Sequence, residues 1–277
     1  MKVKLTILLF CIPLFAQAQP IEAGPLVEGV IRGRPWPIGL GANVKLGYQL
    51  PFYDASHRAL ERNGIQLGVT AQTSPVSFHP GAYLKLIPFT ILEVELGGQG
   101  LTYFGALNSM LIYPSENGDW SFTGQKRRRD EVGLEPMTGW SAYALTRLKL
   151  MVSSVVFVSE YEQRYLELNI EDSETWYDAE RHRLLRQSDT YDRSLTILGW
   201  LFGTDVSNSD MLAGALWREW SGIRSGDRTL TGMAFVRQRS SEEFQTRWLL
   251  LAALYTQDKY HRYEPFGAFM WQRTWSL

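Results

Sequence analysis

The stretch LGANVKLGYQLPF, residues 40–52, alternates apolar and polar or small side chains without a break. Its apolar parity comprises Leu40, Ala42, Val44, Leu46, Tyr48, Leu50 and Phe52. The intervening positions include Gly41, Lys45 and Gly47. Successive side chains of a β-strand point to opposite faces, so this pattern predicts a strand with one apolar and one polar face.

Residues 1–18 have the three parts of a secretory signal peptide. Lys2 and Lys4 precede an apolar stretch at residues 5–15, and Ala16-Gln17-Ala18 forms a small-x-small cleavage site. The apolar stretch is shorter than the roughly 20 residues that a membrane-spanning helix needs. We therefore expect export and cleavage after Ala18, which also removes Cys11. The mature chain then has no thiol and forms a single domain over residues 19–277.

The alternation recurs along the chain, and each further segment is about as long as the 9–11 residues of a tilted membrane strand. Ten such segments follow residues 40–52: 63–73, 76–86, 90–103, 140–150, 155–168, 191–202, 211–220, 229–239, 244–256 and 265–277. A tight turn is expected at Ile87-Pro88-Phe89. Since the chain carries an export signal, we expect the apolar faces to contact lipid and the polar faces to line a lumen.

Eleven strands do not close a usual bacterial barrel, because these barrels have an even number and both ends on the periplasmic side. A twelfth strand is therefore expected at residues 26–34, followed by a turn at Pro35-Trp36-Pro37. Twelve strands place the long connections 104–139 and 169–190 on the outside and make residues 40–52 run inward. Ten or fourteen strands remain possible alternatives.

The last segment places Phe269, Trp271, Trp275 and Leu277 on one face. This face resembles the aromatic-rich terminal strand that outer-membrane β-barrel proteins present to the barrel-assembly machinery. The resemblance covers the architecture of residues 26–277 and carries no functional residues with it. It implies an antiparallel transmembrane β-barrel in the bacterial outer membrane, in contact with outer-membrane lipid and lipopolysaccharide. Arg273 shares the lipid face, and we expect it near the inner headgroups.

Composition excludes some classes of protein. Without the signal peptide the chain has 26 basic and 29 acidic residues, a formal charge of −3, so it has no electrostatic footprint for nucleic acid. The longest apolar run after the signal, residues 248–255, is too short for a membrane helix. A content of 45% apolar residues and 24 glycines fits a barrel and also fits a soluble exported β protein, which stays open.

Alternation assigns ten charged residues to the polar, lumen-facing side. They are Lys45, Lys85, Arg147, Lys149, Arg237, Arg247, Glu93, Glu95, Glu160 and Glu162. A ring of one sign would indicate ion selectivity. Mixed signs favour mutual pairing that fills the lumen, with a conducting path as the alternative. Tyr83, Tyr143, Phe235 and Leu249 are also assigned inward, which favours a constricted lumen over a wide porin.

Catalytic chemistry has one weak candidate pair. Ser77 and His79 share a strand face, the arrangement that a nucleophile and its base require. Their order is the reverse of the one in outer-membrane phospholipase, and alternation turns both into the lumen. No G-x-S-x-G elbow occurs. A lipid- or lipopolysaccharide-modifying hydrolase is therefore the alternative to a channel.

No metal or other cofactor is expected. The histidines, His57, His79, His182 and His261, form no H-x-x-x-H pair. The acidic loop residues Glu171, Asp172, Glu174, Asp178 and Glu180 lack the glycine and spacing of a calcium loop.

The long connections offer two further candidates. Lys126, Arg127, Arg128 and Arg129 could bind an anion such as a lipopolysaccharide phosphate, or could be a solvated run. Trp120 and Trp176 could form a binding platform or cap the barrel. The leading interpretation is a narrow passive channel or a surface-exposed scaffold, and neither the substrate nor the oligomeric state follows from these patterns.

Overall fold

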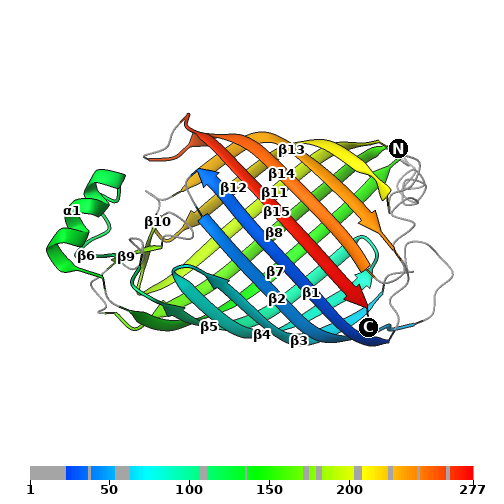
Figure 1. Cartoon of the computed structure of the whole chain (residues 1–277), viewed down its shortest axis with the longest axis horizontal. Coiled ribbons are helices and arrows are strands. Elements are labelled where there is room, and N and C mark those ends of the chain that lie inside the picture. Colours follow the sequence, from blue (N-terminus) through cyan, green and yellow to red (C-terminus); the bar gives the residue numbers. More distant parts are fainter. Residues whose placement is uncertain are drawn as a thin grey trace, which may run out of the picture.

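Twelve antiparallel strands close into a barrel in the computed structural model of the chain (Figure 1). The structure describes residues 23–36, 39–53, 63–106, 111–134, 136–170, 175–178, 183–202, 208–223, 227–241, 244–259 and 263–276. The expected signal peptide lies outside these ranges. The barrel strands are β1 (Gly24–Trp36), β2 (Gly39–Leu50), β3 (Gly64–Ser74), β4 (Ser77–Phe89), β5 (Leu92–Tyr103), β7 (Met137–Val152), β8 (Val155–Leu168), β11 (Ser188–Phe202), β12 (Asp210–Ser221), β13 (Arg228–Ser240), β14 (Phe244–Gln257) and β15 (Pro265–Ser276).

All twelve expected strands are confirmed, with ends that shift by a few residues. The first, β1, closes the barrel by pairing with β2 on one side and β15 on the other. The tight turn expected at residues 87–89 is wrong. Strand β4 continues to Phe89, and the turn lies at Thr90 and Ile91. The register shifts between Leu86 and Phe89, and a proline such as Pro88 is tolerated at an irregularity of this kind.

The two ends of the barrel differ. The start of β1 and the end of β15 lie at one end, together with the short turns after β4 and β7 (Figure 1). Both long connections leave the opposite end. This is the asymmetry expected from the sequence, so we call the end that carries the termini the inner end and the other the outer end.

The outward face of the barrel is apolar. Large apolar side chains that point outward are exposed, among them Leu46 (49%), Val69 (56%) and Leu250 (56%). The alternating inward positions on β3 to β5 are buried and polar, as shown by Gln66 and Thr70. Within the described residues, no helix is both long and apolar enough to cross a membrane.

The long connections fold into a small subdomain at the outer end, which we call the cap. It contains β6 (Leu111–Tyr113), α1 (Phe122–Val132), β9 (Thr175–Asp178) and β10 (Arg183–Arg186). Strands β10, β9 and β6 form a three-stranded sheet in that order. The sequence predicted these segments only as loops, because each strand spans three or four residues and β6 pairs with β9 across more than 60 positions.

Candidate functional site

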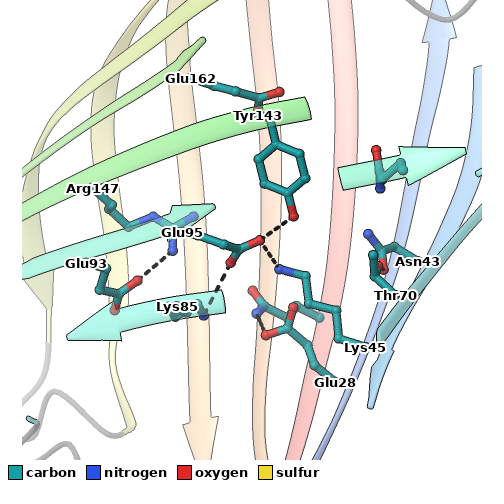
Figure 2. A network of polar contacts seen from close by, with 12 residues as sticks. Glu28, Asn43, Lys45, Thr70, Lys85, Glu93, Glu95, Tyr143, Arg147 and Glu162 are labelled. Atoms are coloured by element: carbon teal, nitrogen blue, oxygen red, sulfur yellow. Dashed lines mark hydrogen bonds and ion pairs between the residues drawn. The ribbon is translucent and has the colours of Figure 1, made fainter. Parts of the chain in front are cut away.

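The candidate site is the lumen, where a carboxylate joins charges from three strands. Glu95 on β5 accepts hydrogen bonds from Lys45 Nζ at 2.6 Å and from Tyr143 Oη at 2.8 Å (Figure 2). Lys85 Nζ lies 3.8 Å from the second carboxylate oxygen. Only 6% of the Glu95 side chain is exposed, so this carboxylate is almost wholly surrounded by its partners.

A second group of charges lies beside the first one and includes Glu93. Arg147 Nη1 donates to Glu93 at 2.9 Å, and Lys149 pairs with the other oxygen of the same carboxylate. Arg147 also pairs with Glu160 on the neighbouring strand. Figure 2 shows Arg147 and Glu93 next to the Glu95 group. The pattern of mixed signs therefore gives mutual pairing, as the sequence favoured.

A third group extends the network towards the outer end. Glu162 accepts from Arg164 at 2.9 Å and from Arg193 at 2.6 Å. Arg164 also donates to Gln99 at 2.6 Å and to Ser141 at 3.1 Å. Arg164 and Arg193 were not predicted from the sequence. Arg164 shares the inward parity of the predicted residues Glu160 and Glu162 on β8, whereas no inward residue was predicted on β11.

Strand register brings most of these charges together. Glu93 stands opposite Arg147, Arg147 opposite Glu160, and Lys85 opposite Glu95. Side chains directly opposite on one face of an antiparallel pair are neighbours, so each acid meets a cation.

The contact of Lys45 with Glu95 is different, because β3 and β4 separate their strands. Glycines in the lumen wall leave the room that this contact needs. A Cβ at Gly47 would lie 2.5 Å from Tyr83 Oη, and one at Gly97 would lie 2.5 Å from the Tyr143 ring. Lys45 Nζ also lies 4.8 Å from the centroid of the Tyr83 ring.

Two inward assignments on β13 are wrong. Arg237 and Phe235 lie on the outward parity, and Arg237 pairs with Asp210 at 2.9 Å. The intervening residue Ala234 is only 1% exposed and points inward, while Met233 is 52% exposed. Both parities of β13 are apolar at their centre, so alternation did not distinguish the two faces.

The remaining assignments for β14 agree with the structure. Arg247 takes the inward parity and donates to Gln238 at 3.0 Å. Leu249 packs against the buried apolar cluster of this wall.

The wall formed by β11 to β15 is built mostly from small and apolar inward residues. Ala213, Ala215, Ala234 and Ala253 are buried there beside Leu251. The lumen thus has a charged wall on β2 to β8, and the wall opposite is apolar along its middle.

Arg32 on β1 faces the charged network across the lumen. It has the same inward parity as Glu28, which accepts a hydrogen bond from Gln272 at 3.0 Å. In the twelve-strand order β8 stands six places from β1, which is the opposite side of the barrel. Arg32 nevertheless lies within electrostatic reach of Glu160 and Glu162. The side chain is exposed although it points inward, so the lumen contains space for water beside it.

The cap packs onto the outer mouth through aromatic residues. Trp176 is fully buried, lies 5.4 Å from the Tyr103 ring and donates to the carbonyl of Arg186 at 3.0 Å. Trp120 is 1% exposed and packs beside Tyr177. Of the two roles left open for these tryptophans, capping is the one that their burial supports.

Burial and hydrogen bonds shift the pKa values of three titratable groups in the cap. Burial raises the pKa of Tyr177 and lowers the pKa of Arg183. Asp119, at the start of α1, accepts from the backbone of Ser121 at 3.1 Å, and hydrogen bonds from Ser121 hold the pKa of this carboxyl below its usual range. Ser121 in turn caps the helix by accepting from Gly124 at 3.2 Å.

A closed antiparallel barrel with an apolar exterior and a charged interior is the architecture of transmembrane β-barrels. The fold is that of an outer-membrane β-barrel.

Solved structures with this architecture match over most of the chain. The β domain of the Bordetella autotransporter BrkA matches with a TM-score of 0.49 and 10% identity, over 93% of this chain and 100% of that chain. LpxR from Salmonella typhimurium gives 0.45 and 12%, over 91% and 100%. The KdgM porin gives 0.41 and 7%, over 91% and 99%. No protein-family model and no curated protein matches the chain. Identities of 7–12% and TM-scores below 0.5 show no function for this chain.

Ser77 and His79 lie near the outer end of β4, facing inward and fully buried. Ser77 Oγ shares a hydrogen bond with Ser74 Oγ at 2.9 Å, and the His79 ring packs edge-on against Tyr103 at 5.3 Å. A lipid substrate outside the barrel does not reach buried inward groups. The role of this pair as a nucleophile and base stays a prediction.

We expect Ser77→Ala to leave the lipid and lipopolysaccharide composition of the producing cells unchanged, because Ser77 is buried under the cap. Mass spectrometry of extracted lipids, compared with an empty-vector strain, measures this. If wild type alters those lipids and Ser77→Ala abolishes the change, the hydrolase alternative is supported instead.

The four cations of the cap belong to α1. Arg128 Nε donates to the carbonyl of Ile112 at 2.7 Å and thereby ties the helix to β6. Arg127 lies 3.6 Å from Asp119, and Arg129 lies 3.6 Å from the neighbouring acid, residue 130. Lys126 is exposed. Local ion pairs of this kind are typical of a solvated surface run, and anion binding here stays a prediction.

In the part of the chain that the structure describes, no group of three metal-ligating side chains occurs. His57, His182 and His261 and the acids Glu171, Asp172, Glu174 and Glu180 lie outside the described residues. Asp178 is buried in β9 opposite Arg183.

Proposed function

We propose that this protein is an integral outer-membrane barrel that forms a narrow passive channel with a preference for small anions. An apolar exterior favours a membrane location, because lipid is the solvent in which exposed leucine and valine are stable. Residues 1–18 would direct export, and the barrel-assembly machinery would insert the terminal strand. The exposed, inward-pointing Arg32 is the observation that carries the channel, since open space lies beside it in the lumen.

The charges of the network and those facing it support the anion preference. The cations are Arg32, Lys45, Lys85, Arg147, Lys149, Arg164 and Arg193, and the acids are Glu28, Glu93, Glu95, Glu160 and Glu162. Seven cations against five acids leave an excess of positive charge in this group of residues. A low-dielectric wall concentrates the field of such an excess and favours anions in the lumen.

Arg32→Glu tests this channel. In planar bilayers we expect wild type to give small discrete currents. In a salt gradient, the sign of the reversal potential should show that anions permeate better than cations. The variant should shift the reversal potential towards cations, because the charge beside the water-filled space changes by two units. Arg218→Glu, an equal change at an exposed outward residue of β12, should leave the reversal potential unchanged.

If folded wild type gives no current in several salts, the channel is contradicted, and a surface-exposed scaffold is the interpretation that remains. The location is tested separately. Recovery in detergent-extracted outer membranes with heat-modifiable gel mobility supports the barrel, and an aqueous-soluble protein would contradict it.

A further inference from the structure

A groove crosses strands β12 to β15 on the outward face of the barrel. It has a volume of about 450 Å³ and an almost wholly apolar lining. Four large side chains at matched register positions bound it on the inner side: Leu212, Phe235, Leu250 and Phe269. Their side chains point outward, so the groove opens towards lipid.

Small residues form the floor of the groove. The next register row towards the outer end contains Met233, Ala252 and Gly267 in succession. Ala252 and Gly267 present at most one methyl group, so the surface is hollow between larger neighbours. A flexible hydrocarbon chain can fill such a hollow, and close packing is the main source of specific contact within a bilayer.

Cations lie at the inner end of the groove. Arg237 Nη2 lies 2.9 Å and Arg239 Nη2 lies 3.2 Å from the carboxylate of Asp210, which both share. Their side chains remain 48% and 45% exposed. Arg273 lies 3.6 Å from the centroid of the Phe244 ring on the same outward face, as the sequence predicted for its parity. At the inner end of the groove, the described residues thus include three cations and one acid. The acids at positions 242 and 243 lie outside the described residues.

We infer that this groove binds one membrane phospholipid, with an acyl chain on the floor and the phosphodiester at Arg237 and Arg239. Arg237 directs Nε and Nη2 at the two carboxylate oxygens of Asp210. A phosphodiester would therefore be bound by the other edge of this guanidinium, which carries Nη1, and arginine is suited to this role because it has five N–H donors. Lipid elsewhere is as apolar as the groove, so retention depends on packing and on the headgroup contact together. The inference is independent of conduction and shares only the membrane location with the proposed function.

The test measures phospholipid that stays bound after detergent exchange. Protein from phosphatidylglycerol nanodiscs is moved into detergent, and native mass spectrometry counts the adducts. We expect one phosphatidylglycerol on wild type. Ala252→Phe fills the floor and should reduce the bound fraction at least tenfold. Ala142→Phe, an equal change at an exposed outward position of β7, is the control and should keep the adduct.

The double variant Arg237→Gln with Arg239→Gln leaves the floor intact and should also reduce the adduct at least tenfold. Heat-modifiable mobility shows that each variant is folded. Equal retention of phospholipid in Ala252→Phe and Ala142→Phe would overturn the inference. So would a mass that corresponds to two copies of the chain, or an adduct of lipopolysaccharide instead of phospholipid. A wild type absent from membranes would instead contradict the proposed location.

Discussion

Glu95→Gln should lower the free energy of unfolding by about 3 kcal/mol, the lower end of the range for breaking a buried ion pair. The substitution removes the charge that compensates Lys45 and Lys85 but keeps an oxygen for the hydrogen bond from Tyr143. Both lysine side chains are 15% exposed, so lumen water solvates them in part and limits the loss. Urea titration in detergent micelles, followed by tryptophan fluorescence, measures the change.

The same variant should conduct better and prefer anions more strongly, since two lysines then face the lumen without a charged partner. Glu167→Gln is the control, because its carboxylate accepts from Tyr165 on the outward face of β8 and should contribute less than about 0.5 kcal/mol. A double-mutant cycle with Lys45→Met isolates the pair. If the two effects simply add, Lys45 and Glu95 are not energetically coupled and their ion pair does not stabilise the barrel.

The strand pattern made much of this network predictable. Alternation along β2 predicted that Lys45 points inward. Because alternation also assigned Glu93 and Glu95 on β5 to the lumen, an acidic partner for Lys45 was the expected outcome. What the pattern could not supply was the partner's identity, because Lys45 reaches past two strands to Glu95. That reach depends on barrel curvature and on glycines such as Gly47 and Gly97, which act in three dimensions.

Arg32, the two faces of β13 and the strands of the cap were not predicted correctly, because their positions depend on contacts that leave no pattern in the neighbouring sequence. Arg32 lies on a strand whose inward face mixes Leu26 and Val30 with charged residues, so alternation is absent there. On β13 both faces are apolar, and burial of Ala234 against neighbouring strands decides which one points inward. The cap strands are too short for periodicity, and their pairing joins β6 to β9 across a long stretch of chain.

Trp176→Ala should loosen the cap and leave the barrel folded. Trp176 is fully buried between Tyr103 of the barrel and the backbone of β10, so its removal leaves a cavity and takes the indole donor away from the Arg186 carbonyl. Replacing a buried tryptophan by alanine costs about 3–5 kcal/mol. A subdomain of three short strands and one helix has little other packing to absorb that loss, so local opening of the cap becomes far more frequent.

Two measurements separate cap opening from barrel unfolding. Limited proteolysis of intact cells should cut residues 104–136 or 169–187 of the variant faster than those of wild type, while heat-modifiable mobility stays unchanged. Single-channel currents should increase if the cap restricts the outer mouth. Trp140→Ala removes an exposed tryptophan from the outward face of β7 and should change neither readout. Equal cleavage of the Trp176→Ala variant and wild type would mean that Trp176 does not hold the cap in place. Faster cleavage with equal currents would mean that the cap does not limit access to the lumen.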